Sequence, residues 1–218
     1  MIPKNNSGKK FGNSRLSSIT RTMKERRNSR ALIKIDPSLT HRLFHPRVPV
    51  IVCSKFGKDI AAMPANSCSA ISDSPPMIAL ALGKRIRTNR VMRKSLVFSI
   101  NWISFEPECS RDIILRLAAP FKTSTGAADK LKQNGVPYFL VRGVPVLGQA
   151  CAFTLCKVNR ILSTGDHDLF IASVLHAKAL PRDFALDGYW RFQEYKPALY
   201  TGSIRRDPLI TIQDPNGF

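Results

Sequence analysis

The sequence predicts a mainly β domain, a β-barrel with a few short peripheral helices. Three observations lead to this prediction. Several short apolar runs are bounded by turn residues, helix signals are few, and strands and helices do not alternate as βαβ units would require. With 218 residues and 44% hydrophobic content, the chain is long enough to bury one core.

The first predicted strands form a hairpin. Residues 48–54 are rich in β-branched side chains, and the Phe56-Gly57-Lys58-Asp59 sequence that follows supplies a turn. A further strand over 77–82 follows a pair of prolines and ends at Gly83. We therefore expect strands and tight turns throughout the first half of the domain.

The remaining strand signals are longer. Residues 95–103 are apolar at nearly every position, which predicts a strand buried on both faces. Residues 150–158 and 169–179 look like a long pair joined through a turn at Gly165. Alternation along the second of these strands suits a curved barrel wall.

Three short helices are expected, each preceded by a hydroxyl residue that can cap it. The predicted caps and helices are Thr88 before 89–94, Ser110 before 111–119, and Ser124 before 127–133. Pro120 and Gly135 would end the second and third helices. Residues 181–189 read as a surface loop.

The net charge of +19 is unevenly distributed. Residues 1–35 hold ten Lys and Arg against one acid, which leaves 24 basic and 14 acidic residues elsewhere. Such a segment buries too little apolar surface to offset its ordering entropy, so we expect a flexible leader. Its composition also suits an organelle transit peptide, and translation could instead start at Met23. We expect the domain to span 36–206 and a tail to span 207–218.

Composition also limits the function classes. No apolar run approaches the roughly 20 residues that span a bilayer, so we expect a soluble, cytoplasmic protein without a membrane segment. The leader could bind nucleic acid nonspecifically, but it lacks aromatic interleaving and a reader motif. Neither metal nor disulfides are expected, because zinc-type spacing is missing among the cysteines and histidines: Cys53, Cys68, Cys109, Cys151, Cys156, His41, His45, His167 and His176.

Small polar residues stand between apolar strands at Asn66-Ser67-Cys68-Ser69. Backbone amides, a carboxamide and hydroxyls in such a stretch can hydrogen-bond the edge of a heteroaromatic ring that carries carbonyls and ring nitrogens. The alternative interpretation is an ordinary polar connection between two strands.

A cationic stretch follows Gly83. Lys84, Arg85 and Arg87 precede a short helix near Thr88. Unpaired N–H groups at a helix N-terminus, together with charge-assisted bonds from the cations, make a favourable place for a phosphate. In a chain this basic, a solvated loop is the alternative.

The turn Gly165-Asp166-His167 opens directly into the apolar run 168–171. A histidine at the mouth of a strand can face a bound ligand, and Asp166 can fix its tautomer. The alternative is a structural turn histidine. The sequence contains no Gly-x-Ser-x-Gly elbow, Walker loop or GxGxxG motif.

Taken in this order, the segments resemble the flavin reductase-like family, the FMN-binding split β-barrel proteins. The resemblance runs from about Leu43 to about Tyr200. Residues 44–52 are similar to the family's opening strand, and residues 63–78 to its polar loop and double-proline strand entry. Arg87-Thr88 lies at its phosphate-binding loop. The stretch 165–171 also matches, and residues 195–202 are similar to its terminal Tyr-x-Pro-Leu segment.

The resemblance implies a homodimer that holds FMN noncovalently near the subunit interface. It assigns Asn66, Ser67, Cys68 and Ser69 to the isoalloxazine and ribityl groups, Lys84, Arg85, Arg87 and Thr88 to the phosphate, and His167 to the neighbourhood of the ring or nicotinamide. Such enzymes pass hydride from NADH or NADPH to flavin, and electrons onward to free flavin, ferric complexes or a partner protein. A non-enzymatic FMN electron carrier and a basic nucleic-acid-binding barrel are the alternatives.

Three departures from the family pattern stand out. Cys68 occupies a position that is often aromatic, so it is either a small packing residue or a thiol close enough to the flavin to exchange electrons. Ile86 interrupts the hydroxyl-rich phosphate loop, so cations would replace hydroxyl contacts there. Arg205-Arg206 follows Gly202 where relatives often carry an aromatic residue.

Overall fold

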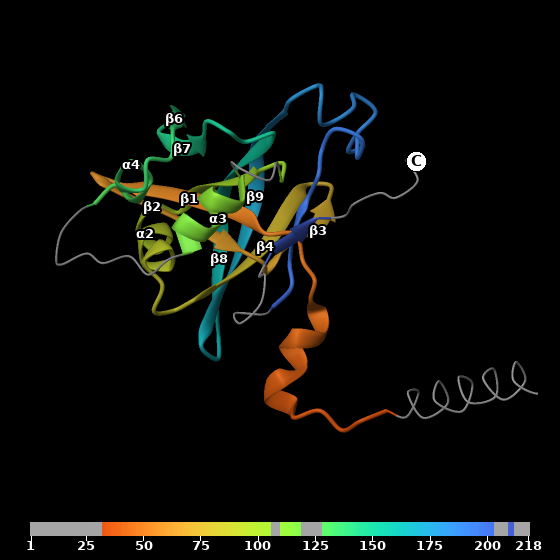
Figure 1. Cartoon of the computed structure of the whole chain (residues 1–218). Helices are drawn as coiled ribbons and strands as arrows, with labels where there is room; N and C mark the ends of the chain where they lie inside the picture. Colours follow the sequence, from red (N-terminus) through yellow and green to blue (C-terminus); the bar gives the residue numbers. More distant parts are fainter. Residues whose placement is uncertain (1–31, 106–109, 119–127, 203–208, 212–218) are drawn as a thin grey trace, which may run out of the picture. The chain divides into compact units, whose positions relative to one another are not determined.

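The computed structural model describes residues 32–105, 110–118, 128–202 and 209–211 (Figure 1). The chain divides into two compact units, Met1–Leu43 and Phe44–Phe218. A 3-10 helix, η1 (Pro37–Phe44), begins in the first unit, where Asp36 accepts hydrogen bonds from the amide and hydroxyl of Ser38, each at 2.8 Å. Most of the predicted leader, including Met23, and most of the predicted tail lie outside the described residues, as does Arg205-Arg206 at the end of the predicted domain.

A seven-stranded antiparallel sheet dominates the second unit, so the predicted mainly β class is confirmed (Figure 1). The strand order is β2-β1-β5-β8-β9-β4-β3. Its strands are β1 (Val50–Phe56), β2 (Asp59–Ala65), β3 (Cys68–Asp73), β4 (Pro76–Gly83), β5 (Val97–Trp102), β8 (Ala152–Thr164) and β9 (His167–Ala179). Two smaller sheets pair β6 (Tyr138–Val141) with β7 (Val144–Leu147) and β10 (Ala198–Tyr200) with β11 (Leu209–Thr211).

The sheet is curled, because its two edge strands are neighbours along the chain. Only Asn66 and Ser67 separate β2 from β3. Seven strands laid flat would hold these edges about 29 Å apart, whereas the Cα path from Ala65 to Cys68 reaches about 11 Å at most. The end of β2 therefore meets the start of β3, and this is the curvature that the predicted barrel requires.

The predicted hairpins are present. Val50 pairs with Ala65 and Phe56 with Asp59, so the turn lies where the sequence predicted it. The long pair β8–β9 is joined by a two-residue turn whose first residue, Gly165, has φ +52°. Glycine suits the first position of such a turn because this backbone conformation is strained for other residues.

Three short helices flank the sheet: α2 (Arg87–Ser95), α3 (Ser110–Ala118) and α4 (Lys130–Gln133). The prediction that Thr88 caps α2 is wrong. A turn closed by the hydrogen bond from Ile86 N to Gly83 O, 3.0 Å, places Ile86 at the cap position, and Thr88 lies buried within the first helical turn. Within the described residues, no helix is long and apolar enough to cross a membrane.

The start of α4 also differs from the prediction. Asp129 caps it by accepting a hydrogen bond from Lys132 N at 3.0 Å. The helix starts late because Ala128 and Asp129 are held in an extended conformation beside β2: Ile60 N donates to Ala128 O at 3.0 Å, and Ile60 forms a bridge with Asp129. The second predicted helix, α3, begins at Ser110 itself. The proposed cap Ser124 and terminator Pro120 lie outside the described residues.

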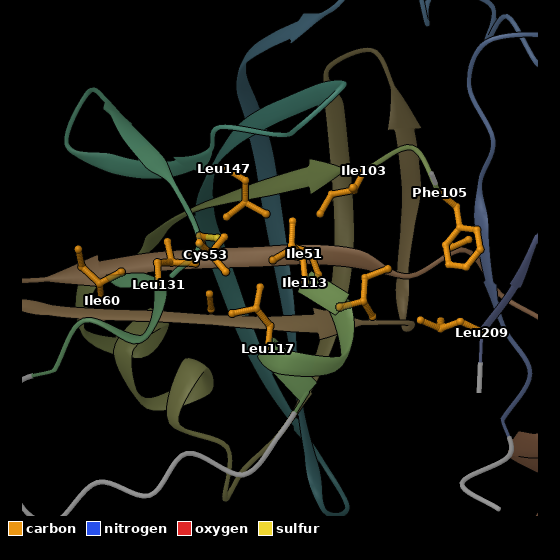
Figure 2. Packing of buried hydrophobic residues seen from close by; sticks show 14 residues of the cluster. Ile51, Cys53, Ile60, Ile103, Phe105, Ile113, Leu117, Leu131, Leu147 and Leu209 are labelled. Atoms are coloured by element: carbon orange, nitrogen blue, oxygen red, sulfur yellow. The ribbon is translucent and has the colours of Figure 1, made fainter. Parts of the chain in front are cut away.

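Two large clusters of buried side chains cover the two faces of the sheet, and a smaller third cluster packs the β6–β7 hairpin against β8. One draws on β1, β2, β4, β5, β8, β9 and α2 and so fills the inside of the curl; Val52, Leu80, Phe98 and Phe170 belong to it. The other packs α3 and α4 against β1 and β2, as Figure 2 shows for Leu117 and Leu131. Val50 and Val52 of β1 belong to the inner cluster, and Ile51 and Cys53 belong to the cluster under α3 and α4, so this strand is buried on both faces.

Leu131 tests how firmly α4 is held. Leu131→Ala should lower the free energy of unfolding by about 2–5 kcal/mol, because it removes buried aliphatic atoms and leaves a cavity. The matched change Leu140→Ala, at a position of β6 that is 48% exposed, should cost less than about 1 kcal/mol. Urea unfolding measures both, and equal losses would contradict this view of the core.

Candidate functional site

An open pocket of about 360 Å³ lies between β2, the start of α2, the end of α3 and α4. Its lining comprises Ala61, Met63, Pro64, Arg85, Ile86, Arg87, Thr88, Arg90, Leu117, Ala118 and Lys130. Three of the residues predicted to hold a phosphate, Arg85, Arg87 and Thr88, therefore line one pocket. The pocket also adds cations that the sequence did not single out, Arg90 and Lys130.

The pocket is electropositive because a helix begins in its wall. The N-terminal amides of α2 carry the positive end of the helix dipole, and Arg85 and Arg90 add full charges beside them. Arg87 has a bracing role as well: it pairs with Asp59 of β2 and donates to Ala128 O at 3.1 Å. The arrangement can hold an anion such as a phosphate.

Lys84 does not line this pocket. Its amine donates to Gly165 O at 2.5 Å, and its backbone amide donates to Asp166 O at 3.0 Å, so it ties the end of β4 to the β8–β9 turn. His167 lies at the same place, opposite Gly83 in the register of β4 and β9. Lys84 and His167 are thus brought together at the turn.

The expected contact between Asp166 and His167 is present. The imidazole Nδ1 lies 2.7 Å from the Asp166 carboxylate, and this contact holds the pKa of Asp166 below its usual value. The His167 side chain remains 45% exposed. The imidazole is therefore oriented by its neighbour and still accessible from solvent.

Asp168 is a positioning residue that the sequence reading missed. Its buried carboxylate accepts hydrogen bonds from Asn89 Nδ2 at 3.0 Å and from the Arg93 guanidinium at 2.9 Å. Asn89 Nδ2 also lies 3.0 Å from Leu82 O. The Asn89 hydrogen bond, reinforced by Arg93, lowers the pKa of Asp168. These contacts attach α2 to β4 and β9 and so orient the helix that forms the pocket wall.

The signal for this network was present in the sequence. Strand alternation places Asp168 on the same face as Phe170 and Ala172, which are buried. A carboxylate on a buried face needs hydrogen-bond partners. The periodicity of β9 therefore indicates a structural carboxylate next to the exposed His167.

The polar stretch after β2 is only partly a connection. Asn66 and Ser67 form the link, whereas Cys68 and Ser69 already belong to β3 and pair with Leu80 and Ala79. The interpretation of all four residues as a loop is therefore wrong. The reason is that the chain pairs with β4 immediately after the link, because Ala81 N donates to Ser67 O at 2.9 Å.

Asn66 has a buried acceptor. Its side-chain Oδ1 is inaccessible to solvent and has no hydrogen-bond partner among the described residues. Its backbone carbonyl accepts a hydrogen bond from Arg47 at 3.2 Å. By the register of β4, Ser67 and His167 lie on opposite sides of this strand and two residues apart along it. The link and the histidine thus flank the end of β4 that leads into the pocket.

Cys68 packs against the inner cluster together with Met63. Burial, followed by the neighbouring Cys156, raises the pKa of the Cys68 thiol to about 12. The thiol is therefore protonated near neutral pH and is a poor nucleophile. This favours the packing role over the redox role. Among the described residues, no three His, Cys, Asp or Glu side chains converge as metal ligands.

Residues 41–201 match a family model described as "Flavin reductase like domain". The chain is 28% identical over 171 residues to an uncharacterized protein of Aeropyrum pernix, covering 76% of this chain and 61% of that relative. It is also 28% identical over 148 residues to the reductase component of a 4-nitrophenol 4-monooxygenase/4-nitrocatechol 2-monooxygenase of Rhodococcus opacus, covering 66% and 71%. The crystal structure of an FMN-binding protein from Thermus thermophilus shares the fold, with a TM-score of 0.65, 22% identity, and coverage of 80% and 92%.

Asp168 should make the stability of the fold sensitive to acid. A carboxylate whose pKa is lowered on folding stabilises the protein above its unfolded pKa of about 3.9, and this stabilisation is lost as pH falls through the folded pKa. Asp168→Asn should therefore reduce the free energy of unfolding at pH 7 and flatten its decline below about pH 4. Urea unfolding at several pH values measures this, and parallel wild-type and variant profiles would contradict it.

The described cysteines should react slowly with alkylating reagents. Burial raises the pKa of Cys53, Cys68 and Cys151 to about 12 and that of Cys156 to about 11. At pH 8 we expect iodoacetamide to label these thiols much more slowly in the native protein than in urea, as peptide mass spectrometry can measure. Rapid native labelling of Cys68 would instead support a reactive thiol. Cys109 lies outside the described residues.

Proposed function

The chain belongs to the flavin reductase-like family, and on that premise we propose that it is an FMN-binding oxidoreductase that takes hydride from NADH or NADPH. Bound FMN would supply the redox chemistry, accepting a hydride and passing electrons on. The protein contributes position, hydrogen bonds and charge. The chain spans about 61% of the length of its Aeropyrum relative, so activity, substrates and partners belong to this proposal.

The observation that carries the proposal is the cationic pocket at the start of α2, within the segment that matches the family. Arg85 and Arg87 can form charge-assisted hydrogen bonds to phosphate oxygens, and the amides of the first helical turn can donate to them. Thr88 lines the same wall. The residues present therefore suit the phosphate of FMN.

The link between β2 and β3 suits the flavin ring. The buried Oδ1 of Asn66 is an acceptor with no hydrogen-bond partner among the described residues, and a flavin ring carries an N–H donor between two carbonyls. The amide of Ser67 and the hydroxyls of Ser67 and Ser69 offer further polar groups, while Cys68 packs inward. The proposal thus places the ring at the link and the phosphate at α2.

His167 is proposed to neighbour the flavin ring or the incoming nicotinamide. It is accessible, and Asp166 orients its imidazole. Hydride transfer needs no general base, so His167 would contribute hydrogen bonding rather than proton abstraction. Lys84 holds the adjacent turn and so maintains the position of this histidine.

We further propose a homodimer with the flavin near its interface, located in the cytoplasm. The electron acceptor would be free flavin, ferric iron or a partner protein. The Rhodococcus relative is named as a reductase component of a monooxygenase, which favours a partner that consumes reduced flavin. A non-enzymatic FMN electron carrier would use the same residues, and a basic nucleic-acid-binding barrel would need none of them.

Spectroscopy and turnover separate these functions. After reconstitution with FMN, the purified protein should show a flavin absorption spectrum and should oxidise NADH or NADPH when free FMN is supplied. Bound FMN with negligible nicotinamide oxidation would support the electron carrier instead. Absence of any flavin spectrum would reject the site, and steeply salt-dependent binding to nucleic acid would then favour the basic barrel.

Arg85→Met should weaken FMN binding about tenfold, because it removes one charge-assisted contact at an exposed side chain without disturbing the core. Lys58→Met, in the exposed turn between β1 and β2, removes the same charge at a residue that does not line the pocket and should leave the affinity unchanged. Fluorescence titration measures both. Equal affinities for the two variants would place the phosphate elsewhere.

A further inference from the structure

The pocket contains a lysine that is largely buried. Lys130, the first residue of α4, is 7% exposed, whereas Lys132 on the same short helix is exposed. Its amine donates to Leu117 O at 2.6 Å, and the side chain lines the pocket together with Arg85 and Arg90. Lysine is rarely buried to this extent, because withdrawing an ammonium from water is costly. The burial of Lys130 therefore indicates a role other than that of a solubilising surface charge.

The surroundings hold Lys130 in place from both sides. Leu131, the next residue, packs into the cluster with Leu117 and Ile60, as Figure 2 shows. Asp129, the preceding residue, caps α4 and accepts a hydrogen bond from Tyr138 at 2.5 Å. The backbone of Lys130 is therefore anchored against β2 and β6, and Lys130 lines the pocket together with residues of α2.

The electrostatics of this position favour an anion. Burial lowers the pKa of Lys130, and the neighbouring Arg87 lowers it further, so its charged form is destabilised. Arg85 and Arg90 add positive charge to the same pocket. Asp59 is paired with Arg87. A dianionic group in the pocket would relieve the repulsion among these cations and stabilise the ammonium of Lys130.

We propose that Lys130 binds the phosphate of the flavin and makes this pocket select phosphorylated flavin over riboflavin. This inference rests on the proposed flavin function. The ligand group is a phosphate monoester, held by Arg85 and the amides of α2 on one side and by Lys130 on the other. An ammonium carries three donors, so the amine can serve both Leu117 O and a phosphate oxygen.

Titrations of riboflavin and FMN against the wild-type chain, Lys130→Met and Lys132→Met test the proposal. Lys132→Met is the matched control, since it removes the same charge from the same helix at an exposed position. Wild type and Lys132→Met should bind FMN more tightly than riboflavin. Lys130→Met should weaken FMN at least about tenfold and change riboflavin by less than about twofold.

Circular dichroism checks that each variant folds. If Lys130→Met does not fold, Lys130→Gln takes its place, because it keeps a donor for Leu117 O without the charge. Equal loss of both flavins in the Lys130 variant, or FMN affinity that matches the Lys132 control, would overturn the role of Lys130 and leave the proposed function standing. Failure of the wild-type chain to bind either flavin would overturn both.

Discussion

The short link between β2 and β3 constrains the whole sheet. Because Asn66 and Ser67 join two strands that stand at opposite edges of the strand order, the sheet has to curl until these edges meet. The curl creates an enclosed face, which side chains of six strands and of α2 fill, and an outer face, which α3, α4 and the β6–β7 hairpin cover. It also places the link itself beside β4, where its polar groups belong to the candidate site.

The pocket then depends on how α2 and α4 are held against this curl. Polar contacts attach α2: Asp168 binds both Asn89 and Arg93, so the helix is oriented from β9. Apolar contacts attach α4 through Leu131. The cations at the start of α2 and the buried Lys130 therefore line the same pocket, although they lie about forty residues apart in the chain. Hydrogen bonds to Asp168 orient α2, whereas α4 is held both by the packing of Leu131 and by the hydrogen bond from Ile60 N to Ala128 O.

Local signals predicted much of the fold. Apolar runs bounded by proline or glycine turn residues identified β1, β4, β8 and β9, since both strand propensity and turn geometry are properties of short stretches. The hairpin β6–β7 was not predicted, although Val141, Val144 and Val146 flank its turn at Gly143. The middle residues of β6 are exposed and its burial does not alternate. The caps of α2 and α4 were mispredicted because backbone contacts with β4 and β2, rather than side-chain hydroxyls, decide where these helices begin.

The sequence by itself determined the β class, the family, and two of the four pocket cations, Arg85 and Arg87, because these reside in residue types and their order. Only the tertiary structure decided which cations share one space. It separated Lys84 from Arg85, assigning the former to the β8–β9 turn, and it brought Lys130 to the pocket from a distant helix. It also placed Cys68 in a strand. The physical reason is that burial and pairing depend on long-range closure of the sheet, which no stretch of local sequence encodes.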